Sequence, residues 1–207
     1  MVLDQIHVIV FDYDGTLVYS NEVKAAAYRP LFPAVSAFDA FLAAALKKFP
    51  VGPRVAVIRD VLESGQLLAA NSEAQTVQVE RLLLQYDKEA TEGAAICAIR
   101  PGSLDVLQVC SKHFPLYLLT TTPQDSIEII LESRKWACFF KEIHGWPTNK
   151  TERLKQIIIE ECVRPTEVLM VGDHPSDIEA ANAAGVSSIL LKPGENLCTV
   201  LKRNKII

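Results

Sequence analysis

Short apolar runs recur along the chain, and each predicts a strand that is buried on both faces. IHVIVF, PLYLLT and EVLMVG end at Phe11, Thr120 and Gly172, and a fourth run, VSSILL, covers residues 186–191. Continuous apolar character over about five or six residues is typical of strands in a sheet that helices cover on both sides. The runs therefore predict a parallel sheet.

Segments with helical spacing lie between the later runs. Residues 103–112 follow Pro101-Gly102, residues 124–133 follow Pro123, and residues 150–162 place leucine and isoleucine on one stripe. Strands that alternate with helices form right-handed crossover units. We therefore expect an α/β fold, with a Rossmann-like, doubly wound parallel sheet as its core.

The stretch between the first two runs has a different pattern. Apolar residues follow helical spacing over 38–49, a second helical segment starts at Pro53 and ends at Gly65, and a third starts at Ser72. In the third segment Ser72 and Gln75 have the spacing of a capping box. We found no convincing strand here, so the pattern predicts consecutive helices.

These patterns divide the 207-residue chain into two predicted domains. Residues 1–19 and 99–207 form the α/β core domain, and residues 20–98 form an α-helical cap inserted after the first strand. Apolar residues make up 49% of the chain and charged residues 22%, which is typical of a folded globular protein rather than a disordered one.

Charge and cysteine content narrow the functional classes. The formal net charge is -4, with 21 basic and 25 acidic residues, which argues against a nucleic-acid partner because such proteins need a basic face. A small anionic substrate needs only one or two local cations. The five dispersed cysteines form no C-x-x-C pair, so neither a disulfide scaffold nor a thiolate zinc site is expected, and the predicted location is cytoplasmic.

Targeting and membrane signals are weak. The first residues include Asp4 where a basic leader would be expected. The longest apolar region, residues 31–46, contains Pro33 and Asp39 and is shorter than the ~20 residues of a membrane span. We expect neither a leader nor a membrane partner.

The first strand ends in a pair of carboxylates. Asp12 and Asp14 are two residues apart, so in extended backbone their side chains point to the same side. Ligands of open α/β sheets bind at the carboxyl ends of strands, and Gly15 permits a sharp turn toward a bound anion. Two like charges held close require a cation, a shared proton, or both. Taken alone, the motif is equally typical of an Asp-Gly turn with a capping Asp.

A second acidic pair follows the run that ends at Gly172. Asp173 comes directly after that strand, and Asp177 lies where a helix begins, a position also typical of a helix N-cap. With the first pair they would place four carboxylates at one edge of the sheet. Carboxylates without imidazole or thiolate suit a hard cation, and Mg²⁺ is the cofactor we expect.

Groups that would balance an anion follow other strands. Thr120 ends the second strand, where its hydroxyl would reach a phosphoryl oxygen, and Lys150 starts a helix, where it would supply a point charge. Lys155, one turn further, is a rival. Either Thr120 or Lys150 alone is equally typical of solvated surface.

The order D-x-D-G-T, T, K and G-D-x-x-x-D resembles the haloacid dehalogenase-like (HAD) superfamily along the whole chain. The position of the helical insertion and the turn at Pro101-Gly102 resemble its phosphoglycolate-phosphatase-type branch. The resemblance implies a Mg²⁺-dependent phosphoric monoester hydrolase. Many relatives have Asp at the position of Tyr19, a departure that bears on the substrate more than on phosphoryl chemistry.

The resemblance also implies residue roles. Asp12 would be the nucleophile that forms an aspartyl-phosphate, and Asp14 the general acid and base. Thr120 and Lys150 would bind the phosphoryl oxygens. The metal ligands would be the Asp12 carboxylate, the Asp14 carbonyl oxygen and Asp173, with Asp177 supporting them.

Other functions remain open at this point. A phosphomutase of the same superfamily keeps all four motifs, and a non-catalytic binding protein could use the same fold. A dehalogenase is disfavoured because such enzymes lack an acid at the position of Asp14, and a signalling receiver module is disfavoured by the order of the motifs. The expected partner is a small phosphorylated substrate, bound by a monomer or homodimer.

Overall fold

The structure is a computed structural model that describes residues 6–49 and 53–207. Residues 1–5, which include Asp4 and the start of the predicted core segment, and residues 50–52 lie outside the described part. The chain divides into two compact units, one running to Asn21 and resuming over Ala95–Ile207, the other formed by Glu22–Ala94. The predicted boundaries, at residues 20 and 98, lie close to these positions.

The first unit contains a five-stranded, fully parallel sheet. Its strands are β1 (Val8–Phe11), β2 (Leu116–Pro123), β3 (Glu142–Trp146), β4 (Val168–Gly172) and β5 (Ser187–Leu190), in the order β3-β2-β1-β4-β5. Strand β1 is therefore central, and β2 and β4 flank it. The predicted doubly wound parallel core is confirmed, while β3 was not predicted.

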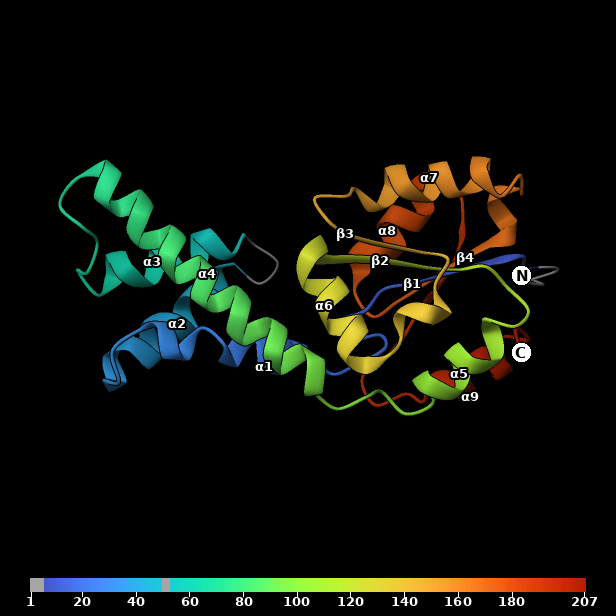
Figure 1. Ribbon diagram of the computed structural model, residues 1–207, viewed down its shortest axis with the longest axis horizontal. Helices are drawn as coiled ribbons and strands as arrows, with labels where there is room; N and C mark the ends of the chain where they lie inside the picture. The colour runs from blue at the N-terminus through green and yellow to red at the C-terminus, as the bar shows by residue number, and fades with distance from the viewer. Residues whose placement is uncertain (1–5, 50–52) are drawn as a thin grey trace. The chain divides into compact units, whose positions relative to one another are not determined.

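Helices cover both faces of this sheet (Figure 1). They are α5 (Ser103–Cys110), α6 (Gln124–Arg134), α7 (Lys150–Glu160), α8 (Pro175–Ala184) and α9 (Leu197–Arg203), with short 3₁₀ turns at Ala137–Phe139 and Pro165–Glu167. On one face Val10, Tyr117 and Met170 pack against Leu154 of α7 and Ala181 of α8. Alternate strand residues are buried on the other face, as the continuous apolar runs require.

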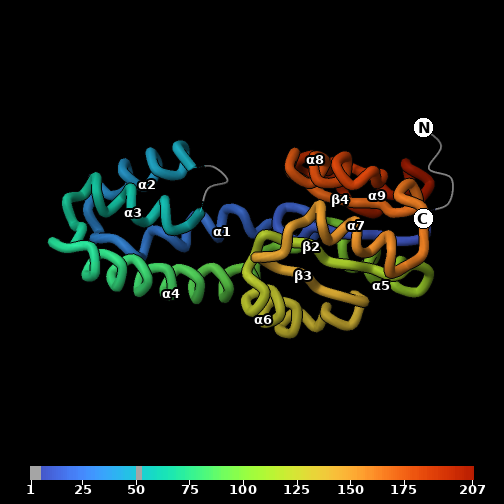
Figure 2. Tube along the Cα trace, turned by 90° about the horizontal axis from the view of Figure 1, so that it is seen from above, coloured from blue at the N-terminus to red at the C-terminus, as the bar shows by residue number. Residues whose placement is uncertain are grey.

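The second unit is helical, as its pattern predicts. It contains α1 (Asn21–Ala26), a 3₁₀ turn (Arg29–Leu31), α2 (Ser36–Lys48), α3 (Arg54–Ser64) and most of α4 (Ser72–Ile96), and Figure 2 follows α2, α3 and α4 along the trace. Its core includes stacked rings of Tyr28 and Tyr86, 4.2 Å apart between centroids. The 25-residue α4 is amphipathic and polar on average; among the described residues no helix combines the length and apolar character that a membrane crossing requires.

The predicted capping box of α4 is wrong. Asn71, not Ser72, accepts the N–H of Ala74 through its side-chain oxygen, at 2.8 Å. The Gln75 side chain instead donates to the Ala69 carbonyl, at 2.9 Å. Asparagine is as good an N-cap as serine, so the sequence Asn-Ser offered two start sites and the structure uses the first.

Candidate active site

Three neighbouring strands bring the predicted site residues to one edge of the sheet. Strand β1 leads into Asp12 and Asp14, β4 leads into Asp173, and β2 carries Thr120 near its end. Because β2, β1 and β4 are adjacent and parallel, their carboxyl ends lie side by side. This topology explains why residues more than 100 positions apart share a site.

Lys150 joins two of the carboxylates. Its Nζ donates to Asp12 Oδ1 and to Asp177 Oδ1, both at 2.6 Å. Lys150 is the first residue of α7, and the preceding Asn149 caps this helix by accepting the Glu152 N–H at 3.1 Å. The rival Lys155 is exposed, so the geometry selects Lys150 as the cation facing Asp12.

Burial shapes the electrostatics of this group. Burial raises the pKa of Asp12 to about 7, and the neighbouring Asp177 and Asp14 charges add to the rise while Lys150 opposes it. Burial also disfavours the charge on Lys150, but the Asp12 and Asp177 carboxylates outweigh it and raise the pKa of its ammonium group. Burial likewise raises the pKa of Asp173. The edge thus holds more carboxylates than a single ammonium neutralises.

Asp173 lies against the loop that follows β1. It accepts a hydrogen bond from the Thr16 hydroxyl at 3.2 Å. Gly15 has φ +77°, and a Cβ there would come within 2.0 Å of Asp173 Oδ2. Both the left-handed backbone and the close carboxylate require glycine at this position.

Asp177 is not the N-cap of α8. His174 occupies that position, and its ring accepts the Ser176 N–H at 3.2 Å. Asp177 lies in the first turn, where Oδ2 accepts the His174 N–H at 3.2 Å and Oδ1 faces Lys150. One carboxylate oxygen therefore holds the loop and the other faces the site.

The acidic residues fit a divalent cation. Carboxylate oxygens of Asp12, Asp173 and Asp177 lie within 4.8 Å of one another, and no other such group of three exists among the described residues. All of these donors are oxygens, as Mg²⁺ prefers. Burial is the main cause of the raised pKa of Asp12 and the Asp177 charge adds to it, so a bound cation would offset both effects.

Asp14 is surrounded by hydroxyl groups. Ser20 Oγ donates to its Oδ1 at 2.5 Å, and Thr122 Oγ1 donates to its Oδ2 at 2.6 Å. Thr120 Oγ1 lies 3.3 Å from the same Oδ2 and accepts the Thr122 N–H at 3.2 Å. Ser20 and Thr122 were not singled out from the sequence. The alternation of a strand, which puts residues 120 and 122 on one face, would have pointed to Thr122.

A buried arginine supports the loop after β1, and the sequence did not reveal it. Arg100 is 2% exposed, and its Nε donates to the Gly15 carbonyl at 3.0 Å. Its other donors reach the Lys192 and Glu195 carbonyls, and its guanidinium lies 5.1 Å from the centroid of the Tyr19 ring. The loop that carries the acidic pair is therefore held by a buried cation whose described hydrogen bonds all go to main-chain carbonyl groups.

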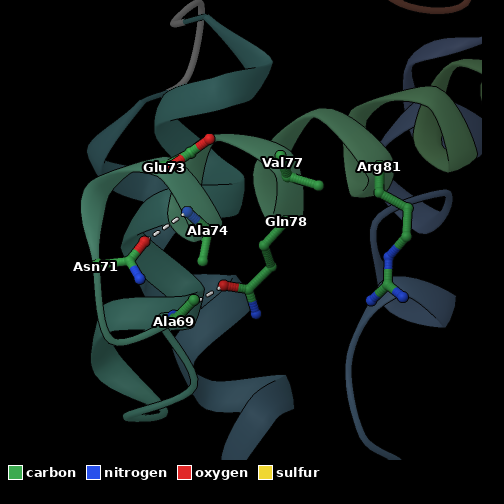
Figure 3. Close-up of a pocket in the computed structure, with 7 residues that line it drawn as sticks. All are labelled: Ala69, Asn71, Glu73, Ala74, Val77, Gln78 and Arg81. Carbon is green, nitrogen blue, oxygen red and sulfur yellow. Dashed lines mark hydrogen bonds between the residues drawn. The ribbon is translucent and has the colours of Figure 1, made fainter.

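The second unit has a surface hollow beside the start of α4 (Figure 3). It is lined by Ala69, Asn71, Glu73, Ala74, Val77, Gln78 and Arg81. Asn71 and Gln78 make hydrogen bonds within this segment, to Ala74 and Ala69. The hollow contains one acid and one arginine and lacks the grouping of carboxylates found at the sheet edge.

Comparison with known families identifies the family of the chain that carries this acidic edge. The model of the haloacid dehalogenase-like hydrolases matches residues 6–185, which is most of the chain and includes every residue of the acidic edge. The chain belongs to the haloacid dehalogenase-like hydrolase family. The predicted membership is thereby confirmed.

Relatives within the HAD-like family agree with the predicted branch. The chain is 28% identical to the phosphoglycolate phosphatase of Pseudomonas putida over 194 residues, covering 91% of this chain and 70% of that protein. It is 27% identical to the phosphoglycolate phosphatase of Synechococcus elongatus over 195 residues, covering 91% and 84%. These likenesses support the predicted phosphoglycolate-phosphatase-type branch, and the family match makes this HAD-like chain a hydrolase, as predicted.

A solved structure agrees on the fold of the HAD-like chain. The HAD-hydrolase YfnB from Bacillus subtilis, determined with bound magnesium, superposes with a TM-score of 0.73 at 17% identity, over 98% of this chain and 100% of that one. At this identity the likeness supports the Rossmann-like fold alone. The role of each site residue in this chain rests on its own geometry.

Proposed function

We propose that this HAD-like protein is a Mg²⁺-dependent phosphatase that hydrolyses a small phosphorylated metabolite of the phosphoglycolate kind through an aspartyl-phosphate. The observation that carries the proposal is the contact of Lys150 Nζ with Asp12 Oδ1 at 2.6 Å. Through this contact, the buried Asp12 carboxylate at the end of the central strand is paired with a cation that also attracts a phosphoryl group. The relatives named above are phosphoglycolate phosphatases, which supports the same substrate class.

In the first half-reaction an Asp12 carboxylate oxygen attacks phosphorus. The P–O bond to the leaving group breaks as the acyl-phosphate bond forms, and the leaving oxygen takes a proton from Asp14. Lys150 offsets the repulsion between the two anions, and the Thr120 hydroxyl donates to a phosphoryl oxygen. Asp14 and Asp12 come from the same loop, so donor and nucleophile keep a fixed separation.

In the second half-reaction water attacks the phosphorus of the acyl-phosphate. Asp14, now ionised, takes a proton from that water, and Asp12 leaves as a carboxylate. The Asp12 and Asp173 carboxylates and the Asp14 carbonyl oxygen would hold Mg²⁺, with Asp177 beside them. The ion would supply positive charge that neutralises the phosphoryl group.

Two further expectations belong to the proposal. We propose a cytoplasmic location, supported by five cysteines that are all free thiols, and a monomer or homodimer as the active form.

A phosphomutase of the same family would use the same carboxylates but return the phosphoryl group to a sugar rather than to water. A non-catalytic binding protein would bind phosphoesters without turnover.

The test is a screen of phosphorylated metabolites, 2-phosphoglycolate included, with release of inorganic phosphate as the readout. We expect Mg²⁺-dependent release that a chelator abolishes, and we expect Asp12→Asn to lose about 10⁴-fold or more of the rate while keeping the wild-type melting temperature within a few degrees. Transfer to a sugar phosphate without release of phosphate would favour the mutase. Most of the wild-type rate in Asp12→Asn would refute the nucleophile.

A further inference from the structure

We propose that Thr122 is a positioning residue for Asp14: its hydroxyl fixes the carboxyl group in the orientation from which it protonates the leaving oxygen. The inference rests on the proposed function, in which Asp14 is the general acid. Sequence motifs of the family give Thr120 a role in phosphate binding, whereas Thr122 lies outside them. The contact that carries the inference is the 2.6 Å hydrogen bond from Thr122 Oγ1 to Asp14 Oδ2.

The backbone at Thr122 is held in place on two sides. Its N–H donates to Thr120 Oγ1 at 3.2 Å, and its carbonyl oxygen would be 2.6 Å from a Cβ at position 145. Gly145 of β3 therefore allows the two strands to approach closely at this point, where the register between them shifts. Thr122 is 4% exposed, so its hydroxyl has little access to solvent.

The three hydroxyl groups around Asp14 contribute unequally. Thr120 lies 3.3 Å from Oδ2, at the long end of a hydrogen bond, and its predicted task is to contact the phosphoryl group. Ser20 holds the other oxygen, Oδ1, at 2.5 Å. Thr122 is thus the shorter of the two described hydroxyl contacts on Oδ2.

The chemistry of a hydroxyl suits a group that both gives and takes a proton. A threonine hydroxyl donates to a carboxylate and, after rotation, accepts from a carboxylic acid. An ammonium or guanidinium partner can only donate, and it would favour the ionised form. The described hydrogen bond from Thr122 can therefore persist in both protonation states of Asp14, which keeps the carboxyl group in one orientation through both half-reactions.

The leaving group of the substrate separates positioning of the acid from a general structural role. An alkyl phosphate such as 2-phosphoglycolate leaves as a strongly basic alkoxide and needs the proton, whereas 4-nitrophenyl phosphate leaves as a weakly basic phenolate and does not. The parameter kcat/KM covers the steps up to departure of the leaving group. We therefore compare kcat/KM for the two esters in wild type, Thr122→Val and Thr122→Ser, with Asp14→Asn as the benchmark.

We expect Thr122→Val to lower kcat/KM for the alkyl ester by about 10- to 100-fold and for the aryl ester by less than about 3-fold, since misplacing a catalytic group costs up to ~10²-fold. Thr122→Ser, which keeps the hydroxyl, should recover most of the alkyl activity. Thr76→Val, which removes a hydroxyl from α4, controls for the substitution, and melting temperatures report folding. If Thr122→Val does not fold, Thr122→Ala replaces it.

An equal loss with both esters would overturn the inference, because it would mean that the whole site is disturbed. Unchanged kcat/KM with both esters would overturn it as well. Failure of the proposed function gives a different result: the wild-type protein then hydrolyses neither ester, and the inference about Thr122 is overturned together with the proposed function. Selective loss with the alkyl ester, rescued by serine, supports Thr122 as the residue that positions Asp14.

Discussion

The two carboxylates that follow β1 lie in contrasting surroundings. Asp12 contacts the Lys150 ammonium at the start of α7 and has Asp173 and Asp177, which follow β4, nearby. On the β2 side, the partners of Asp14 in the described hydrogen bonds are neutral hydroxyl groups. Two residues of the same type, separated by one position, thus differ in their described contacts: Asp12 contacts an ammonium group, and Asp14 accepts hydrogen bonds from hydroxyl groups.

The difference follows from what each group does in the proposed reaction. A nucleophile must be ionised when it attacks, and an adjacent cation favours that form. An acid that gives a proton and takes one back works best with partners that accept either form. Different elements supply the two sets of partners: Lys150 begins α7, which follows β3, whereas Thr120 and Thr122 lie on β2.

Asp14→Asn should produce the largest contrast with the Asp12 variant. The Asp14→Asn variant keeps the Asp12 nucleophile, so with 4-nitrophenyl phosphate we expect a burst of about one nitrophenolate per enzyme. Turnover after the burst should be slowed about 10²- to 10⁴-fold, because no base then activates the water that hydrolyses the acyl-phosphate. Rapid-mixing absorbance at the nitrophenolate band measures both phases. Asp12→Asn should give no burst, and a burst in that variant would reverse the two assignments.

Lys150→Met tests the contribution of the ammonium group that contacts Asp12 and Asp177. Removal of the ammonium leaves the buried Asp12 and Asp177 without their cation, so without divalent ions we expect the free energy of unfolding to fall by about 3 kcal/mol. Turnover should fall about 10²- to 10³-fold. Denaturant melts with and without Mg²⁺ measure the effect, and Mg²⁺ should restore part of the stability.

Lys155→Met is the matched control on the same helix. Lys155 is exposed, so its loss should change neither stability nor turnover appreciably. A loss of turnover as large as that of Lys150→Met would make Lys155 the phosphate-binding lysine. Unchanged stability in Lys150→Met would contradict the described ion pairs.

The smallest effect is expected away from the site, where Arg153 makes two 2.7 Å hydrogen bonds to Glu160. The Arg153 hydrogen bonds lower the pKa of Glu160, so the pair stabilises the fold above the ordinary pKa of glutamate and loses this effect as the pH falls through the lowered value. Glu160→Gln should therefore lower the melting temperature slightly at neutral pH and not in acid. Thermal melts from pH 7 to pH 3 measure the difference, and a gap that widens in acid would contradict this sign.

Much of the fold follows from local pattern, and the exceptions have physical causes. The three inner strands, β1, β2 and β4, are buried on both faces over most of their length, so burial left continuous apolar runs in the sequence. Strand β5, at one edge, keeps an apolar run although Leu190 is exposed. Strand β3, Glu142–Trp146, lies at the edge of the sheet with Glu142 and His144 only half buried and Trp146 exposed, so no such run marks it. An edge strand needs fewer apolar residues, and its sequence signal is correspondingly weak.

The site was predictable where topology alone brings residues together. Asp12, Asp14 and Asp173 follow strands, and a parallel sheet places the carboxyl ends of its strands at one edge independently of how individual side chains pack. The partners of Asp14 were harder to predict: Ser20 lies beyond a turn, and Thr122 follows only once the alternation of β2 is read from Thr120. Arg100 depends on carbonyl groups far along the chain, which no local pattern reveals.

Arg100 connects the C-terminal segment to the loop that carries the predicted nucleophile. The family match ends at residue 185, yet two of the carbonyl groups that receive this guanidinium belong to Lys192 and Glu195. Shortening the chain to the matched segment would strand a full positive charge in the interior, directly beneath the bend at Gly15. The 22 residues after position 185 therefore help to hold the nucleophile loop in place, through the two carbonyl groups that accept hydrogen bonds from Arg100.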